Sequence, residues 1–285
     1  MSAAPKLVLL GYGQLGMAVH LEALSRGTAG AILATTRSAA HADEMMATYG
    51  VNTLLLSSPE AAPAVTAATE ILRGAARAGD DVIVSCPPDG TSDASYAPVL
   101  RAARRIVYIS STGVFGSASG HIDDTTAVDP SDARAARRLA AEDAWRDVGA
   151  IVLRAPAIYG PRSGLHKRLL AGTYRLVEDG ARHVSRIHVD DLAVLALAAL
   201  ERAAPGSTYV VGDHGPATQR QVTEWLCARL GLALPPSASE GDAPSPFRGD
   251  RRIDGGRALR ELGVTLRYAT YREGYEAVLR AGGYV

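Results

Sequence analysis

KLVLLGYGQLG, residues 6–16, joins an apolar run of strand length to a glycine-rich turn, and a segment with helical spacing follows the turn. Gly11 allows a tight turn, Gly13 lets the backbone approach a pyrophosphate, and Gly16 lets the helix pack close to the strand. N–H groups at the start of this helix would bind the phosphates. Because strand, turn and helix come in this order, we predict a dinucleotide-binding turn rather than a glycine-rich turn of another α/β domain. The candidate cofactor contacts are Gly11, Tyr12, Gly13, Gln14, Leu15 and Gly16.

The second predicted strand ends near Thr36, about twenty residues further on. Chains that bind NAD usually carry an acidic residue there, which binds the ribose hydroxyls. This chain has Thr35, Thr36 and Arg37 instead, and a cation suits a 2′-phosphate. We therefore predict NADP(H) as the cofactor, with Thr36, Arg37 and Ser38 as candidate contacts.

The composition limits the class of protein. With 285 residues, 47% of them hydrophobic, the chain can bury a full core. Its formal net charge of zero argues against general binding to nucleic acid or to a membrane surface, and no apolar stretch reaches membrane-spanning length. The first strand follows the N-terminus without room for a signal peptide, and Cys86 and Cys227 form neither a metal pattern nor a disulfide framework. We expect a cytoplasmic protein without a metal site that acts on a small molecule as a monomer or homodimer.

Strand-like apolar runs alternate with helical patterns through the first part of the chain. This alternation is typical of a doubly wound parallel sheet with helices on both faces, the α/β class. We predict that residues 1–160 form the cofactor-binding domain. Its predicted strands are Leu7–Leu10, Ala31–Thr36, Thr53–Leu56, Asp81–Ser85, Arg105–Ser110 and Ala150–Arg154.

The pattern changes after Gly160. We predict that residues 161–285 complete the sheet and form a small second lobe. Leu234–Asp250, rich in Pro, Ser, Gly and Ala, is a predicted loop, either a lid over a cleft or a surface loop. The other predicted elements are helices near Leu165–Gly172, Asp190–Ala203 and Gln219–Leu230, and strands at Val184–Val189 and Thr208–Val211.

The second part begins with an excess of positive charge. Between Pro161 and His188 only Glu178 and Asp179 are acidic. Such a segment suits a substrate with a carboxylate or phosphate group, and the alternative is a basic exterior. The basic residues are Arg162, Lys167, Arg168, Arg175, Arg182 and Arg186, accompanied by His166 and His183.

Three further segments are Tyr108–Gly116 (YISSTGVFG), Arg154–Pro161 (RAPAIYGP) and Arg186–Ala193 (RIHVDDLA). In order and spacing they resemble the atypical and extended short-chain dehydrogenases of the NAD-dependent epimerase/dehydratase family. Ala217–Gly231 and Tyr268–Tyr275 are similar to a bacterial YeeZ-like subgroup of that family. The resemblance implies a Rossmann fold with a substrate-capping lobe and NADP in the cleft. In this register the candidate cofactor contacts also include Cys86, Pro87, Pro88 and Pro156.

The chemistry of this family usually depends on a Ser or Thr at the end of the fifth strand and on a Tyr-x-x-x-Lys in the next long helix. Ser111 occupies the first position, with Thr112 beside it. A hydroxyl there can bind a substrate carbonyl and stabilise developing negative charge. The alternative is a serine that satisfies backbone groups at the strand end.

This chain departs from the family at the tyrosine and the lysine, which Arg134 and Arg138 replace. An arginine stays protonated and cannot relay a proton, but it can bind an anion or a carbonyl group. One helical turn apart, the two side chains would present two cations on one face beside the nicotinamide. The alternative is a solvated, arginine-rich face.

An oxidoreductase would then need a substitute proton donor. Tyr159, in the turn after the sixth strand, and His188, before the next helix, are candidates, and each also has a structural interpretation. Asp190 and Asp191 fit helix-start caps better than acids. We predict an NADPH-dependent reductase of a small carbonyl or imine compound. The alternatives are a redox-neutral isomerase, epimerase or dehydratase that retains NADP, and a catalytically silent NADP-binding sensor or scaffold.

Overall fold

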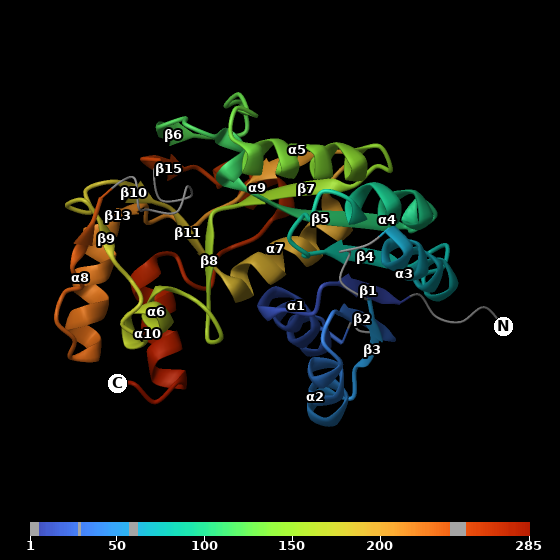
Figure 1. The fold of residues 1–285 in the computed structure, drawn as a ribbon, viewed down its shortest axis with the longest axis horizontal. Helices are drawn as coiled ribbons and strands as arrows, with labels where there is room; N and C mark the ends of the chain where they lie inside the picture. The colour runs from blue at the N-terminus through green and yellow to red at the C-terminus, as the bar shows by residue number, and fades with distance from the viewer. Residues whose placement is uncertain (1–5, 28–29, 57–61, 240–248) are drawn as a thin grey trace. The chain divides into compact units, whose positions relative to one another are not determined.

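The computed structural model describes residues 6–27, 30–56, 62–239 and 249–285. A seven-stranded sheet has the strand order β12-β7-β5-β4-β1-β2-β3 (Figure 1). The pairs β2–β3, β1–β2, β1–β4 and β4–β5 are parallel, so the strand order reverses direction beside β1. In sheets of this kind the ligand crevice lies at that reversal, next to the strands' carboxyl ends. The strands are β1 (Leu7–Leu10), β2 (Ile32–Thr36), β3 (Asn52–Leu55), β4 (Asp81–Val84), β5 (Arg105–Ser111), β7 (Ile151–Ala155) and β12 (Thr208–Val210).

Helices cover both faces of this sheet (Figure 1). On one face, α1 (Gln14–Ser25) is linked to α7 (Val189–Arg202) by an ion pair between Arg26 and Glu201. On the other face, α3 (Ala62–Ala75), α4 (Ser92–Leu100) and α5 (Ala133–Arg146) pack against the strands through Leu72, Leu100 and Trp145. The central strands β1, β4, β5 and β7 are buried along most of their length, as burial between two helix layers requires, whereas the edge strand β3 is not. Helix α2 (Ala39–Tyr49) follows β2. The predicted α/β fold with a parallel sheet is confirmed.

Contacts between Cα atoms divide the chain into two interleaved units. The first consists of residues 1–110, 136–153 and 193–208, and the second of residues 111–135, 154–192 and 209–285. These units do not test the predicted domain boundary at residue 160, which stays a prediction. In the contact units, the segment after β5 belongs with the C-terminal part, whereas most of α7 belongs with the first unit.

The second unit combines small sheets with short helices. Its strand orders are β13-β10-β15-β6, β11-β8 and β14-β9. A core of Tyr159, Tyr174, Val222, Leu226 and Tyr275 holds its helices to these strands. The strands are β6 (Gly120–Ile122), β8 (Ala157–Tyr159), β9 (Leu176–Val177), β10 (His183–Val184), β11 (Arg186–His188), β13 (Ala217–Thr218), β14 (Ser237–Ala238) and β15 (Arg251–Ile253). The helices are η1 (Thr112–Phe115), α6 (Leu165–Leu170), α8 (Gln219–Leu230), α9 (Gly256–Leu262) and α10 (Tyr271–Ala281).

In two places the elements of the second unit differ from the predicted ones. The predicted strand Val184–Val189 is in fact two strands, because β10 pairs with β13 and β15 whereas β11 pairs with β8. In the predicted loop Leu234–Asp250, Ser237 and Ala238 pair with β9 instead, and residues 240–248 lie outside the described residues. None of the described helices has the length and apolar character that a membrane crossing needs.

Candidate functional site

The glycine-rich turn has the geometry that its sequence predicts. Gly11 has a φ of +94°, and a Cβ on it would lie 2.9 Å from the Cys86 sulfur. A Cβ on Gly16 would lie 2.6 Å from the Gly11 carbonyl oxygen, so only glycine lets α1 approach the turn this closely. A Cβ on Gly13, by contrast, would meet no described atom within 4 Å. The turn therefore needs two glycines for its own packing and leaves Gly13 facing the space that a pyrophosphate requires.

A cavity of about 280 Å³ lies beside this turn, within the first unit. Hydrogen bonds hold its floor: the Gly11 N–H donates to the Thr35 hydroxyl (2.9 Å), and the Ser85 hydroxyl donates to the Gly11 carbonyl oxygen (2.8 Å). Burial raises the pKa of the Cys86 thiol to about 11, so this side chain forms an uncharged wall. The predicted contacts that line the cavity are Gly11, Tyr12, Gly13, Thr36, Arg37, Cys86 and Pro87.

The other predicted cofactor contacts do not line this cavity, and several residues that do line it were not predicted. Leu15 and Gly16 are buried, which fits packing of the first helical turn. Pro156 belongs to the second unit. The remaining predicted contacts outside the lining are Gln14, Ser38 and Pro88. The unpredicted lining residues with polar side chains include His41, Ser85, Asp89, Ser92 and Asp93, from loop and helix positions without a recognisable motif.

The end of β2 carries no carboxylate. Thr36 accepts a hydrogen bond from the Ser38 N–H (3.3 Å), and the Ser38 hydroxyl caps α2 by accepting from the His41 N–H (3.2 Å). Arg37 is exposed and lines the cavity. The His41 imidazole is bound to the Tyr12 carbonyl oxygen through Nε2 (2.7 Å). Arg37 is therefore the residue at the strand end that could meet a 2′-phosphate, while Ser38 serves the helix.

Ser111 ends β5 and begins η1. Its hydroxyl oxygen accepts a hydrogen bond from the Gly113 N–H (3.0 Å), so it does satisfy a backbone group. This bond uses the oxygen as an acceptor and leaves the hydroxyl proton for another partner. Thr112 beside it is buried. Both interpretations of Ser111, helix cap and donor to a carbonyl, are compatible with this geometry.

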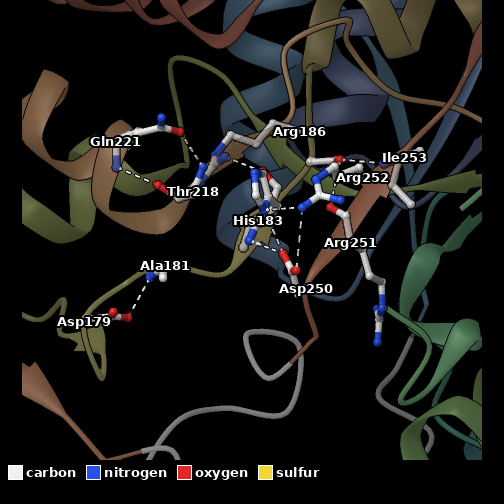
Figure 2. Close-up of polar contacts among 12 residues, drawn as sticks. Asp179, Ala181, His183, Arg186, Thr218, Gln221, Asp250, Arg251, Arg252 and Ile253 are labelled. Carbon is white, nitrogen blue, oxygen red and sulfur yellow. Dashed lines mark hydrogen bonds and ion pairs between the residues drawn. The ribbon is translucent and has the colours of Figure 1, made fainter. Parts of the chain in front are cut away.

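Arg251, which was not predicted, holds the turn after Ser111 in place. Its guanidinium group donates to the carbonyl oxygens of Ala118 (3.0 Å), Thr112 (3.1 Å) and Gly116. Figure 2 shows that Arg251 and its neighbour Arg252 extend in different directions, with Arg252 directed to His183 and Asp250. One of the two adjacent arginines is thus a fixed support of the turn that carries Ser111.

The two arginines on α5 have different surroundings. Arg138 is half-buried and donates to the hydroxyl group of Tyr108 (3.3 Å), a buried residue of β5. Arg134 is exposed, and its backbone N–H is bound to the Asp132 carboxylate. Arg138 therefore has a structural contact, and Arg134 has the surroundings of a solvated side chain.

The candidate proton donors are both buried, at 2% exposure each. Burial raises the pKa of Tyr159 far above its usual range and lowers the pKa of His188 to about 4, so both side chains are neutral at pH 7. The rings lie edge to face, 5.2 Å apart. His188 Nδ1 accepts from the Asp190 N–H (3.2 Å). In these surroundings neither group has a pKa near neutrality, which a general acid or base needs.

Asp190 and Asp191 lie in the first turn of α7, as predicted for residues at a helix start, but the Asp191 carboxylate binds backbone groups outside the helix. Its two oxygens accept hydrogen bonds from the backbone N–H groups of Arg267 (2.7 Å) and Tyr268 (3.1 Å), far along the chain. A buried acidic residue that was not predicted, Asp213, follows β12. One of its oxygens accepts from the Gly215 N–H, and the other has no partner among the described residues. Burial raises the pKa of Asp213 to about 7.

A second cavity, of about 320 Å³, lies within the second unit. Among the described residues that line it none is acidic, so the positive excess seen in the sequence gathers here. Its wall also contains three tyrosines, Tyr159, Tyr174 and Tyr275. The cations of the wall are Arg162, Lys167, Arg168 and Arg186. No group of His, Cys, Asp and Glu in the described part of the chain could hold a metal ion.

A glycine turn at the reversal point of a parallel sheet, with a cavity beside it, defines a dinucleotide-binding protein of the Rossmann class. The residues fit such a cofactor, because Gly13 leaves open the space that a side chain would fill. A family model described as "NAD dependent epimerase/dehydratase family" matches residues 8–212. The chain belongs to this family.

The chain is also similar to individual proteins. The protein YeeZ of Escherichia coli K12 is 28% identical over 92% of this chain and 96% of its own. A 3-diazoavenalumate denitrifying reductase from a Streptomyces species is 35% identical over 127 residues, which are 41% of each chain. Among solved structures, a functionally unknown conserved protein from Silicibacter pomeroyi has a TM-score of 0.79 and 28% identity, over 98% of this chain and 99% of its own.

Proposed function

We propose that this protein is an NADPH-dependent reductase of a small carbonyl or imine compound. The observation that carries the proposal is the combination of an open glycine turn with a strand end that has Arg37 where an NAD-binding chain has an acidic residue. Family membership supports nicotinamide chemistry, and a reductase among the relatives supports its direction. Cytoplasmic location and a monomeric or homodimeric state remain part of the proposal.

The cofactor, when bound, supplies the hydride. Ser111 would donate its hydroxyl proton in a hydrogen bond to the substrate carbonyl oxygen and stabilise the negative charge that develops there. The bond from the Gly113 N–H orients the hydroxyl oxygen for this role. Hydride transfer needs position and an oriented electrophile, so it survives the loss of the Tyr–Lys pair at a reduced rate.

Water fits better as the proton source than Tyr159 or His188. The pKa of Tyr159 is too high, and that of His188 too low, for transfer at neutral pH. Arg134 and Arg138 cannot release a proton, but Arg134, being exposed, can bind an anionic group. Slow proton uptake from water agrees with a slow reductase.

A redox-neutral enzyme that keeps NADP bound is the second candidate. The family description, which names epimerases and dehydratases, favours it. A silent NADP-binding module is the third, favoured by Arg134 and Arg138 at the tyrosine and lysine positions. The three differ in net oxidation of NADPH and in product formation, so one assay separates them.

Titration of NADPH and NADH against the wild type and Arg37→Ala tests the cofactor. We expect NADPH to bind at least about tenfold tighter than NADH, because one charge-assisted bond to the 2′-phosphate contributes about 1.5–3 kcal/mol. Arg37→Ala should abolish this preference. Arg73→Ala, which removes an exposed arginine that pairs with Glu70 on α3, is the matched control and should keep it. Equal affinities in the wild type would overturn the choice of NADP.

NADPH absorbance against a panel of ketones, imines and anionic carbonyl compounds tests the reaction. Ser111→Ala should lower turnover by about 10²-fold while NADPH affinity stays nearly unchanged. Tight NADPH binding without oxidation of NADPH on any compound would favour the silent module. Product formed without net oxidation would identify the redox-neutral enzyme.

A further inference from the structure

The second cavity contains a charged group that lacks a counter-charge. Arg186, on β11, is 6% exposed and lines the cavity. Its guanidinium group donates to the Val184 carbonyl oxygen, and no carboxylate among the described residues lies within ion-pair distance of it. A buried cation without a paired anion is costly, because the charge has lost its hydration. A ligand carboxylate would supply the missing charge.

Asp213, whose backbone is hydrogen-bonded to that of Arg186, does not supply this missing negative charge. The Asp213 backbone N–H donates to the Arg186 carbonyl oxygen (2.8 Å), and the two side chains attract each other electrostatically without an ion pair. Because burial raises the pKa of Asp213 to about 7, its carboxyl group is partly protonated at neutral pH. Asp213 therefore forms no ion pair with Arg186, and the guanidinium group can meet an anionic group of a ligand.

The other cations of the wall have partners or contacts of their own. Lys167 donates to the Tyr284 hydroxyl (2.9 Å), and the Arg168 guanidinium lies 4.8 Å from the centre of the Tyr174 ring. Both residues are also less buried than Arg186. These contacts single out Arg186 as the inner receptor of an anion, with Lys167 and Arg168 nearer the solvent.

The rest of the wall is aromatic and apolar. Tyr159 and Tyr275 are stacked with 4.2 Å between ring centres, and Tyr174 lines the same cavity. The Tyr275 hydroxyl oxygen accepts from the Leu165 N–H (3.1 Å), which leaves its proton to donate. Such walls bind a planar, apolar body through ring-edge and stacking contacts. The volume of about 320 Å³ lies at the lower end of ligand pockets, which suits a small ligand.

We propose that this cavity binds a small aromatic carboxylic acid, with its carboxylate on Arg186 and its ring among the three tyrosines. The proposal names the substrate class of the reductase, and in that respect it rests on the proposed function. The binding itself needs neither hydride transfer nor a particular nicotinamide cofactor. Arg186 is therefore the residue that selects acids over neutral analogues.

Isothermal titration calorimetry on the full chain tests this proposal with two pairs of probes: 4-hydroxycinnamate against its amide, and benzoate against benzamide. We expect each acid to bind the wild type at least about tenfold tighter than its amide, since a charge-assisted hydrogen bond is worth that factor. Arg186→Met should remove the difference. Arg175→Ala is the matched control, because Arg175 is an exposed arginine of the same segment that does not line the cavity, and it should preserve the difference.

Three results would overturn the proposal: equal binding of acid and amide to the wild type, an acid preference that persists in Arg186→Met, or tighter binding of UDP-glucose than of either acid at this cavity. If Arg186→Met does not fold, the comparison of acid with amide on the wild type still decides. Acid binding with no preference for NADPH, or with no reduction of any compound, would reject the proposed function and leave this site standing.

Discussion

Arg251 donates a hydrogen bond from Nη1 to the carbonyl oxygen of Thr112, a residue 139 positions earlier in the chain. The same guanidinium group reaches Gly116 and Ala118, so one side chain binds three carbonyl groups of a single turn. Asp129 supports that turn independently, because its carboxylate accepts from the Ser117 N–H (3.2 Å). The backbone that orients Ser111 is thus fixed by residues that are distant from it in sequence.

Arg251→Ala should therefore loosen this turn. Three partly buried carbonyl groups lose a charged donor, and we expect a loss of about 2–3 kcal/mol in the free energy of unfolding and about tenfold in turnover. Hydrogen exchange should become faster in peptides that cover residues 112–118. Arg252→Ala, on the same strand but directed to His183 and Asp250, is the control and should leave that exchange unchanged. Equal exchange in the two variants would show that Arg251 is dispensable for the turn.

Gly13→Ala should mainly weaken cofactor binding, whereas Gly16→Ala should mainly lower stability. An alanine at position 13 meets no described atom within 4 Å, so we expect less than about 1 kcal/mol change in stability but at least about tenfold weaker NADPH binding. An alanine at position 16 would press on the Gly11 carbonyl oxygen and should cost about 1–3 kcal/mol of stability. Thermal unfolding without cofactor, followed by NADPH titration, distinguishes them. The prediction fails if Gly13→Ala binds NADPH as the wild type does.

Tyr159→Phe tests whether Tyr159 donates a proton. Its buried hydroxyl group has no partner among the described residues, so removing it should raise the free energy of unfolding by about 1 kcal/mol. Turnover should fall by less than about tenfold, below the usual effect of losing a general acid. Tyr275→Phe is the control, because it removes an oxygen that accepts from the Leu165 N–H and should lower stability by about 1 kcal/mol. A drop of about 10²-fold or more for Tyr159→Phe would restore the tyrosine as the acid.

Asp213 should make stability fall as the pH rises. Burial raises its pKa from 3.8 to about 7, so the folded protein binds more protons than the unfolded chain between these values. Stability from this group is fully present below pH 3.8 and is lost progressively as the pH rises to about 7. Urea unfolding of Asp213→Asn against the wild type should show an advantage for the variant that grows from pH 5 to pH 8. Parallel curves for Asp213→Asn and the wild type would exclude this role.

Local patterns in the sequence were sufficient for the strands of the first unit. The predicted Leu7–Leu10 coincides with β1, and Asp81–Ser85 differs from β4 by one residue, because a strand buried on both faces is a continuous apolar run. The glycine turn could also be predicted, since Gly11 and Gly16 meet backbone and packing requirements that no other residue meets, and Gly13 leaves space for a pyrophosphate. Ser111 and Arg37 follow from their positions at strand ends.

Local sequence patterns could not predict three other features: the second cavity, the hydrogen bonds from Arg251, and the burial of Asp213. Each depends on contacts between segments far apart in the chain, such as Leu165 with Tyr275, and a local pattern carries no information about which distant segments meet. The sequence showed that the segment from Arg162 to Arg186 is basic. That its cations line one cavity, and that Arg186 alone is buried there without an ion pair among the described residues, follows from the packing of the second unit. Burial then decides the chemistry, because the free energy of a charge depends on the water and the counter-charges around it rather than on residue type.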